Sequence, residues 1–325
     1  MSRDIPAPLG AAIAAQLHAQ SRRRIATVAE SMSDGYRAGR ASREVIDSEE
    51  SVLAYLLARL PATYAAVSAA LEEIVARAPA FAPASLLDAG AGPGTASWAA
   101  MAVWPGLARV TLLDDSEMFR EMAHRLAAAS PHAALSAASV QAGNLTLKQA
   151  LPTSDLVIAS YTLAELPDDH IAGIASRLWE ACAGILLLVE PGTPAGYRRI
   201  IACRETLLRE GAAIVAPCTG DYACPLRGPD WCHFSVRLAR SRDHMIAKGA
   251  QAPFEDEKYC YLALARPHVA VTPAAARVLA PPRRNKAGID MKLCTDGIVA
   301  MRAVASRERR AFAKLRRVQW GDGLS

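Results

Sequence analysis

The sequence has 325 residues, enough for about two domains, and its 52% hydrophobic and 21% charged residues exclude a largely disordered chain. No apolar run reaches the roughly 20 residues needed to cross a bilayer, because Gly, Pro or charged residues interrupt every run. The net charge of +5 is modest for the whole chain, so only its placement can point to a partner.

The first region, residues 1–82, is predicted to be helical. Leucines recur at helical spacing between residues 53 and 60 after Asp47 and Ser48, which can cap a helix start, and Pro61 ends this run. A second helix is predicted for residues 64–78. The segment has no alternating strand pattern, and we interpret it as a helical region that precedes a sheet domain.

The N-terminal segment also bears on the compartment. Arg3 and Asp4 precede a mildly Ala-rich helix, and no apolar block followed by a cleavage site indicates secretion. We therefore expect a bacterial cytoplasmic protein without membrane association. A mitochondrial matrix location stays open, because Asp4 and the lack of a Ser-rich stretch argue only mildly against a presequence.

The second region, residues 83–212, alternates short apolar runs with helical stretches. Strands separated by helices form βαβ units, which predict a parallel sheet covered on both faces, with right-handed crossovers. The candidate strands are residues 85–89, 109–114, 137–142, 156–160 and 185–190.

The third region, residues 213–325, is predicted to be small and irregular. Pro and Gly punctuate the chain from Pro217 to Pro229, and a strand-like run follows at residues 259–265. The pair Asp296-Gly297 lies between two apolar runs and predicts a hairpin.

This region also concentrates the positive charge. Residues 265–325 hold 13 Lys and Arg against four Asp and Glu, a net charge of +9. A solvated surface is the simpler interpretation, and contact with a phosphate backbone is the one we favour. The candidate RNA-contacting cations are Arg302, Arg307, Arg309, Arg310, Lys314, Arg316 and Arg317.

Residues 85–94, Ser-Leu-Leu-Asp-Ala-Gly-Ala-Gly-Pro-Gly, predict a strand followed by a tight turn. Glycines let such a turn close and let its backbone approach a ligand. The run lacks the third glycine of a dinucleotide fingerprint and fits the acid-x-G-x-G-x-G pattern of class I methyltransferases, which bind S-adenosylmethionine (SAM). We expect Gly90, Gly92 and Gly94 to form the turn and Asp88 to help hold the methionine end.

Polar residues at the ends of the next strands complete the predicted SAM site. Asp114 lies 24 residues after Gly90, where a carboxylate can accept hydrogen bonds from both ribose hydroxyls. Asn144 follows the third strand, where this class contacts adenine, and Ser160 ends the fourth. Together these residues predict an α/β fold of the class I SAM-methyltransferase (Rossmann-like) type.

No catalytic residue is assigned. The fourth strand continues into Tyr161-Thr162-Leu163-Ala164-Glu165 without the Asn/Asp-Pro-Pro-aromatic motif of base amino-methyltransferases or the nucleophilic Cys of cytosine C5 enzymes. Tyr161 and Glu165 can orient a target, but such residues are more often packing and surface residues.

Three of the seven cysteines crowd the irregular region. Cys218, Cys224 and Cys232 have the spacing C-x5-C-x7-C, and Cys294 is a distant fourth. Four thiolates can close a tetrahedral zinc site or hold an iron–sulfur cluster, and the spacing does not choose between them. Cys182 and Cys203 lie in apolar contexts and are expected to be small core residues.

Several separate blocks, in order, give the chain a specific resemblance to the methyltransferase-like proteins of the small ribosomal subunit, found in bacteria and mitochondria. The blocks are Leu60-Pro61-Ala62-Thr63-Tyr64, the glycine turn, Val189-Glu190-Pro191-Gly192-Thr193, Ala216-Pro217-Cys218, Cys224-Pro225-Leu226, Trp231-Cys232-His233-Phe234, Pro253-Phe254-Glu255-Asp256-Glu257-Lys258 and Trp320-Gly321-Asp322.

The resemblance implies a [4Fe–4S] cluster held by Cys218, Cys224, Cys232 and Cys294, and association with small-subunit rRNA and proteins during assembly. Cys260 falls within a strand and is expected to be a core residue. The chain departs from the family at Thr219-Gly220, where Pro-His is usual, so a histidine fallback ligand is lost there. His233 is the remaining alternative ligand.

Three functions therefore compete. The first is an rRNA-binding assembly factor that also methylates rRNA, and the second is a non-catalytic scaffold on the same subunit, monomeric away from the ribosome. The third is a small-molecule methyltransferase with a zinc-stabilised insertion. The missing Pro-Pro-aromatic motif favours the second over the first, and the basic C-terminal region disfavours the third.

Overall fold

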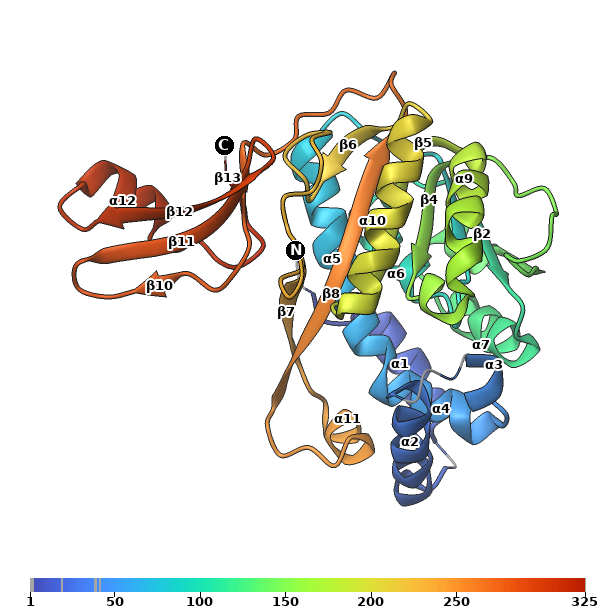
Figure 1. The fold of residues 1–325 in the computed structure, drawn as a ribbon. Helices are drawn as coiled ribbons and strands as arrows, with labels where there is room; N and C mark the ends of the chain where they lie inside the picture. The colour runs from blue at the N-terminus through green and yellow to red at the C-terminus, as the bar shows by residue number, and fades with distance from the viewer. Residues whose placement is uncertain (1–2, 19, 38–39, 41, 325) are drawn as a thin grey trace.

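The computed structural model describes residues 3–18, 20–37, 40 and 42–324, which form an α/β body and a smaller β-rich module that projects from it (Figure 1). The body contains an eight-stranded sheet. Its strands are β1 (Ser85–Ala89), β2 (Arg109–Asp114), β3 (Ser139–Ala142), β4 (Ser154–Ser160), β5 (Cys182–Pro191), β6 (Ala213–Ala216), β7 (Phe234–Ala239) and β8 (Phe254–Ala265).

The strand order is β3-β2-β1-β4-β5-β8-β6, with β7 paired to β8 beside this path. The first five strands are parallel to one another, whereas β8 runs antiparallel between β5 and β6. This is the arrangement of class I methyltransferases, in which a reversed strand enters the sheet near one edge. The predicted fold class is confirmed.

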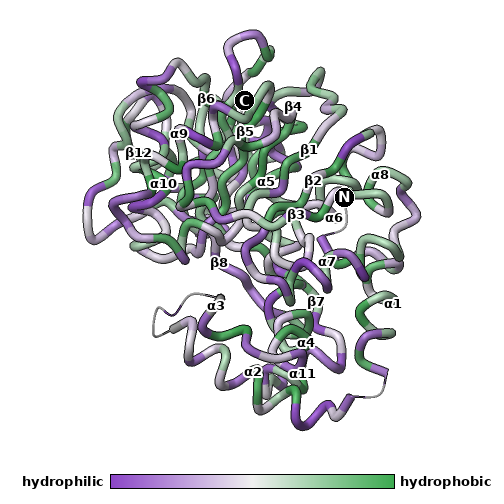
Figure 2. Tube along the Cα trace, turned by 90° about the vertical axis from the view of Figure 1, so that its right-hand side faces the viewer, coloured by the Kyte–Doolittle hydropathy of each residue, from purple (hydrophilic) through white to green (hydrophobic). Residues whose placement is uncertain are grey.

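Helices cover both faces of the sheet because successive strand residues point to opposite sides. Leu86 and Ile158 belong to the core under α5 (Leu60–Arg77), α6 (Thr95–Val103) and α7 (Glu117–Ala128). Leu87 and Val157 belong to the core under α9 (Ile171–Ala181) and α10 (Pro194–Arg209). Figure 2 shows hydrophobic stretches at β4, β5 and α5, as expected for strands and helices buried between layers.

Shorter helical segments connect these layers and leave the strand order unchanged. They are α8 (Ala133–Ser136), η1 (Leu163–Glu165), η2 (Asp168–His170) and α11 (Arg242–Ala247). The third predicted strand begins two residues later than expected, because α8 ends at Ser136 and is followed by a turn.

The chain before β1 is helical, and no strand occurs in its described residues. Its other helices are α1 (Ala7–Gln16), α2 (Arg22–Arg37), α3 (Ser42–Val45) and α4 (Glu49–Ala58). Ser48 caps α4 by accepting a hydrogen bond from the backbone N–H of Ser51, as predicted. The next helix starts at Leu60 rather than residue 64, because Pro61 is tolerated in a first turn, where its missing N–H has no partner.

Within the described residues, no single helix is long and apolar enough to cross a membrane. Helices α4 and α5 meet those criteria only together, as a pair bent by 48°. Most side chains of both helices are buried in the body.

The sheet extends beyond residue 212, the predicted end of the second region, because β6, β7 and β8 all belong to it. The sequence predicted a strand only at residues 259–265, whereas β8 begins at Phe254. Its first half alternates exposed and half-buried residues where it pairs with β7 alone, and it therefore lacks the apolar run of its second half. The body thus ends at Ala265.

Residues 276–324, called the C-terminal module below, form the projecting unit. Its elements are β9 (Ala276–Val278), β10 (Arg283–Arg284), β11 (Gly288–Thr295), β12 (Ile298–Ala305), α12 (Arg309–Leu315) and β13 (Gly323–Leu324). Asp296 and Gly297 both have positive φ and join β11 to β12, so the predicted hairpin is confirmed. The module has a small core of its own, made by Val278, Ile289, Met291, Leu293, Val304 and Val318.

The buried Arg277 joins the module to the body. Its side chain is 1% exposed, and its Nη1 donates to Glu73 Oε2 and to the carbonyl oxygen of Gly321, both at 2.7 Å. Its Nε donates to the carbonyl oxygen of Pro217 at 2.9 Å. One guanidinium therefore connects α5, the cysteine-bearing loop and the end of the module.

Replacing Arg277 by Leu should lower the free energy of unfolding by about 3 kcal/mol, because removing one partner leaves the others buried without compensation. Urea denaturation of both proteins measures this difference. The matched control is Arg237→Leu, which removes an ion pair with Asp256 whose two side chains are 63% and 43% exposed. The control should change stability little, since exposed ion pairs contribute little. Equal destabilisation by the two substitutions would contradict this role of Arg277.

Candidate functional site

A pocket opens at the carboxyl ends of β1, β2, β3 and β4, and its empty space, counted together with the solvent at its mouth, is about 830 Å³. Strand order reverses between β1 and β4, and ligands of open α/β sheets bind at such a switch point. Five of the seven predicted SAM residues line it: Gly90, Gly92, Asp114, Asn144 and Ser160. Asp88 and Gly94 do not.

The glycine turn is fixed by its contacts with neighbouring strands. Gly90 has φ +70°, and a Cβ at this position would lie 2.3 Å from Cγ2 of Thr162, so only glycine fits. Gly94 also has positive φ and abuts Leu112. Gly92 shares the positive φ (+53°), but a Cβ there would meet no atom within 4 Å. The backbone of Gly92 therefore borders open pocket space.

Asp88 lies beneath the turn, where it is completely buried. Its Oδ2 accepts hydrogen bonds from the N–H of Ser97 at 3.0 Å and from Oγ of Ser97 at 2.8 Å, while its Oδ1 has no hydrogen-bond partner. Burial raises the pKa of Asp88 to about 7, against the lowering effect of the Ser97 hydrogen bonds. Asp88 thus holds the first turn of α6, and a role with the methionine end of SAM stays a prediction.

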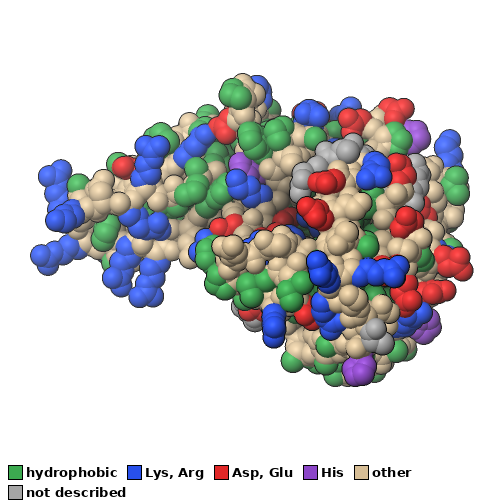
Figure 3. Space-filling view, turned by 90° about the horizontal axis from the view of Figure 1, so that it is seen from below, with side chains coloured by type: hydrophobic (Ala, Val, Ile, Leu, Met, Phe, Trp, Pro, Cys, Tyr) green, Lys and Arg blue, Asp and Glu red, His purple; other side chains and the backbone are tan. Residues whose placement is uncertain are grey.

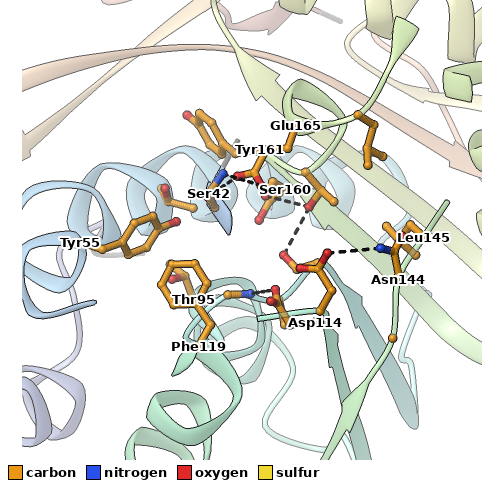
Figure 4. A pocket seen from close by; sticks show the side chains of 18 of the residues that line it. Ser42, Tyr55, Thr95, Asp114, Phe119, Asn144, Leu145, Ser160, Tyr161 and Glu165 are labelled. Carbon is orange, nitrogen blue, oxygen red and sulfur yellow. Dashed lines mark hydrogen bonds between the residues drawn. The ribbon is translucent and has the colours of Figure 1, made fainter. Parts of the chain in front are cut away.

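Asp114 ends β2 at the pocket wall (Figure 4). Its Oδ2 accepts from the N–H of Gly92 at 2.7 Å, and its Oδ1 accepts from the N–H of Ser116 at 2.9 Å. Burial raises its pKa. Each carboxylate oxygen can accept a further hydrogen bond, so the residue ties the turn to β2 and can still receive a ligand hydroxyl.

Asn144 lies on the opposite side of the pocket from Tyr55 and Phe119 (Figure 4). Its Nδ2 donates to Asp115 Oδ2 at 3.4 Å, and its Oδ1 accepts from the N–H of Thr146 at 2.8 Å. The rings of Tyr55 and Phe119 meet edge to face with centroids 5.0 Å apart. The pocket therefore has a polar wall from the sheet and an aromatic wall from helices α4 and α7.

The N-terminal helical region closes part of the pocket through Ser42. The N–H of Ser42 donates to Glu165 Oε2 at 3.1 Å, and its Oγ donates to Glu165 Oε1. Tyr36 and Ser42 share a further hydrogen bond of 2.9 Å between their hydroxyl oxygens. Burial raises the pKa of Glu165 to about 7, although the bonds from Ser42 lower it. Glu165, expected to be a surface residue, is instead half-buried and is hydrogen-bonded to Ser42 of the N-terminal helical region.

Tyr161 has a strained backbone at the pocket, with φ +58° directly after β4. Non-glycine residues with positive φ are uncommon and are enriched at functional sites. Its hydroxyl donates to Glu257 Oε1 at 2.7 Å, and the guanidinium of Arg59 lies 5.9 Å from its ring centroid. The side chain is thus held between the sheet and helix α5 and does more than fill space.

The four predicted ligand cysteines line one cavity. Cys218, Cys224, Cys232 and Cys294 line a hollow between the β6–β7 loop and the β11–β12 hairpin, whose empty space, counted together with the solvent at its mouth, is about 630 Å³. Within the described chain, however, no three His, Cys, Asp or Glu side chains are arranged to hold a single metal ion. The four thiols line one hollow, but they are not arranged around a common centre as the ligands of a single metal ion would be.

Two arginines and a tyrosine border the thiols. Arg204 is 3% exposed, and its Nη2 donates to the carbonyl oxygens of Gly220 at 3.0 Å and Tyr222 at 2.5 Å. No carboxylate of the described residues forms an ion pair with it. The hydroxyl of Tyr197 lies 3.1 Å from Sγ of Cys224, and Arg277 also lines the cavity. The hollow is therefore suited to an anionic occupant.

Burial raises the pKa of Cys218, of Cys232 and, to about 11, of Cys294. Thiolates bind metals, so loading this cavity would release protons. The alternative ligand His233 lies elsewhere. His233 stacks on Trp231 with centroids 4.8 Å apart and does not line the cavity.

The remaining cysteines are core residues, as predicted. Cys182, Cys203 and Cys260 are 1%, 0% and 1% exposed and belong to the core beneath α9 and α10. The Sγ of Cys260 donates to the carbonyl oxygen of Cys232 at 3.1 Å. Cys260 thus supports the loop without facing the cavity.

Sequence reasoning missed Ser42, Arg204 and Arg277. Each meets its partner through a contact across a long stretch of chain, with Ser42 and Glu165 separated by 123 positions. A buried Arg carries no local pattern that distinguishes it from a surface Arg. Arg277 was counted instead among the charges of the basic region.

Comparison with known proteins places this geometry in context. The profile of the family described as "Mitochondrial small ribosomal subunit Rsm22" matches residues 49–325. The chain is 29% identical over 301 residues to the human "Ribosome assembly protein METTL17, mitochondrial", an alignment that covers 87% of this chain and 64% of that protein. The chain therefore spans somewhat under two thirds of the length of this relative.

Two solved structures are similar in fold. The magnesium protoporphyrin IX methyltransferase of Synechocystis PCC 6803 with bound SAM is 18% identical, covers 62% of this chain and 77% of its own, and has a TM-score of 0.41. The plantazolicin methyltransferase in complex with SAH is 12% identical and has a TM-score of 0.43. The match covers 74% of this chain and 99% of that one. The fold assignment rests on the strand order given above.

Replacing Glu165 by Gln should change how stability depends on pH. The folded pKa of about 7 exceeds the ordinary value of 4.5, so the folded chain retains a proton that the unfolded chain loses between these values. Wild-type stability contributed by this group therefore falls as pH rises from about 4.5 to 7. Urea denaturation should show that the free energy of unfolding of the variant, relative to that of the wild type, is higher at pH 8 than at pH 5. A difference that is the same at both pH values would contradict the raised pKa.

Proposed function

Because this chain belongs to the Rsm22 family of mitochondrial small ribosomal subunit proteins, we propose that it is an assembly factor of the small ribosomal subunit that binds rRNA, SAM and a [4Fe–4S] cluster. The observation that carries the proposal is the extent of the family match. Residues 49–325 include the lining of the pocket at the glycine turn except Ser42, all four cavity cysteines and the described C-terminal module. The relative named as a ribosome assembly protein supports the same role.

The charge of the C-terminal module supports contact with rRNA. Residues 283–317 contain 11 Lys and Arg against three Asp and Glu, and every one of these cations except Lys292 is exposed. Figure 3 shows Lys and Arg gathered over the projecting module, with few acids among them. Such a surface attracts a phosphate backbone with little dependence on base sequence. The competing small-molecule methyltransferase gives this surface no role.

The pocket supports SAM as the first ligand. Asp114 at the end of β2 would accept the ribose hydroxyls, Asn144 would contact the adenine, and the open space beside the Gly92 backbone would receive the methionine portion. The aromatic wall of Tyr55 and Phe119 offers an apolar surface for the nucleoside. When bound, SAM supplies an activated methyl group. The residues named here bind and orient it.

Scaffolding is the favoured role, and rRNA methylation is the second candidate. Glu165 is already engaged by Ser42, so an incoming base has to displace this contact before it can use the carboxylate. The strained Tyr161 favours the second candidate, because backbone strain at a pocket is often retained for function. The two candidates differ in whether any rRNA base depends on this protein for its methyl group.

The cysteine cavity supports the cluster that the family resemblance implies. A four-iron cluster needs four thiolates around one volume, and Cys218, Cys224, Cys232 and Cys294 all line this hollow. Arg204 supplies a buried positive charge for the anionic assembly. The cluster would tie the β6–β7 loop to the β11–β12 hairpin.

The site of action follows from the partner. Small subunits are assembled in the mitochondrial matrix and in the bacterial cytoplasm, and the names of the family and the human relative favour the matrix. The bacterial cytoplasm and a monomeric state away from the ribosome stay predictions.

Anaerobic purification should yield a protein with a broad visible absorption band and with iron and acid-labile sulfide in equal amounts. Cys294→Ser should lose both, because Cys294 faces the cavity. Cys182→Ala is the matched control and should keep both, since that thiol is buried in the core and does not line the cysteine cavity. Zinc in place of iron, or a band that survives Cys294→Ser, would rule out the cluster assignment.

Deleting the gene should deplete mature small subunits on sucrose gradients, and the wild-type gene should restore them. Gly92→Asn places a side chain in the pocket without meeting a protein atom at its Cβ, so it should weaken SAM binding at least tenfold in calorimetry and fail to restore assembly. The control is Gly249→Asn, at a glycine that also has positive φ (+58°) and whose Cβ would meet nothing; it should bind SAM and restore assembly as the wild type does.

Methylated rRNA bases are mapped in the same strains. If every base keeps its methyl group while subunits mature poorly, the scaffold role holds. If one base loses its methyl group in the deletion and in Gly92→Asn, methylation is the function. Normal subunit maturation in the deletion strain would overturn the assembly role itself.

A further inference from the structure

Tyr222, in the loop between β6 and β7, is an exposed aromatic residue with an ordered position. Its side chain is 52% exposed. A Cβ added to Gly220 would lie 2.9 Å from Cε2 of Tyr222, and one added to Gly297 would lie 2.8 Å from its Cβ, so the side chain packs between two glycine backbones. Its carbonyl oxygen accepts from Arg204. The ring is thus held in place while half of the side chain faces solvent.

An apolar strip on the hairpin lies on the cavity side of the module. Paired residues on antiparallel strands project to the same face, and Cys294 pairs with Val299 while Lys292 pairs with Met301. The side chains of Val299 and Met301 are 37% and 71% exposed. The other face of β11 is the buried one, which carries the module core. Apolar side chains therefore stand in solvent on the face that holds Cys294.

Tyr222 and this strip meet at the hairpin turn. Gly297, which touches Tyr222, is only two residues from Val299, and Tyr222, Cys294 and Gly297 all line the cysteine cavity. The two parts come from segments about 75 positions apart that the cavity brings together. They form one surface, named here the Tyr222 platform and defined as Tyr222, Val299 and Met301.

Resting on the proposed rRNA contact, we propose that the Tyr222 platform binds single-stranded RNA by stacking unpaired bases while the surrounding cations bind its phosphates. Aromatic and apolar side chains inside a basic surface are the combination that single-stranded RNA recognition uses. The exposed Lys and Arg of residues 283–317 favour a polyanion over a neutral protein partner, because a neutral partner would leave those charges to be desolvated without compensation. Paired RNA keeps its bases stacked and offers the platform nothing to bind.

The test uses the full-length protein, purified anaerobically, and fluorescence anisotropy with a short labelled single-stranded RNA and a duplex of the same length. Tyr222→Ala should weaken single-strand binding about tenfold, a loss typical of one stacked base, and leave duplex binding unchanged. Tyr222→Phe keeps the ring and should bind as the wild type does. Met301→Ala lies outside the cysteine loop and should weaken single-strand binding even if Tyr222→Ala disturbs that loop.

Salt dependence separates stacking from charge. The slope of log affinity for the single strand against log salt should stay unchanged in Tyr222→Ala. Arg309→Ala combined with Arg310→Ala should flatten this slope, because each lost phosphate contact on a single strand removes about 0.7 from it. Wild-type affinity in both platform variants, or equal weakening for duplex and single strand, overturns the inference while the rRNA contact stands. Unchanged RNA binding with lost binding to a small-subunit protein overturns it in favour of a protein partner. A wild type that binds no RNA overturns the proposed rRNA contact as well.

Discussion

The guanidinium of Arg277 is the interaction on which the arrangement of this molecule depends. A fully buried cation is unfavourable unless it is paired and hydrogen-bonded, and Arg277 meets this requirement only when Glu73, Pro217 and Gly321 are all in place. These partners belong to the helical region, the cysteine loop and the end of the module. The contacts of Arg277 therefore restrict the module to a narrow range of positions relative to the body.

The two candidate sites share this construction from distant segments. At the SAM pocket, the sheet supplies the glycine turn and Asp114, while the N-terminal helical region supplies Ser42 and Tyr55 of the aromatic wall. At the cysteine cavity, the β6–β7 loop supplies three thiols and the hairpin supplies the fourth. Each site is complete only after long-range packing, so the stability of the fold and the occupancy of the sites are thermodynamically linked.

The features that could be predicted from sequence are those that depend on short, local stretches of residues or on motifs of the family. The glycine turn, the strand-end positions of Asp114 and Ser160, the Asp296-Gly297 hairpin and the shared position of the four cysteines follow from local spacing or from the family resemblance. The reversed strand β8 was only half predicted, because its amphipathic first half resembles an ordinary surface segment. The hydrogen bonds between Ser42 and Glu165 and the burial of Arg277 were not predictable. A polar contact between distant segments produces no periodic pattern in the sequence.

The bond from Arg277 to the carbonyl oxygen of Gly321 has a consequence for synthesis of the chain. The sheet of the body is complete once Ala265 has been added, but the buried cation acquires its last partner only when Gly321 emerges, and β13 forms after that. A nascent chain therefore contains every strand of the body sheet before it contains the last partner of the cation beside the cysteine cavity. Synthesis of residues 266–321 is thus an interval in which the body can fold while Arg277 still lacks Gly321.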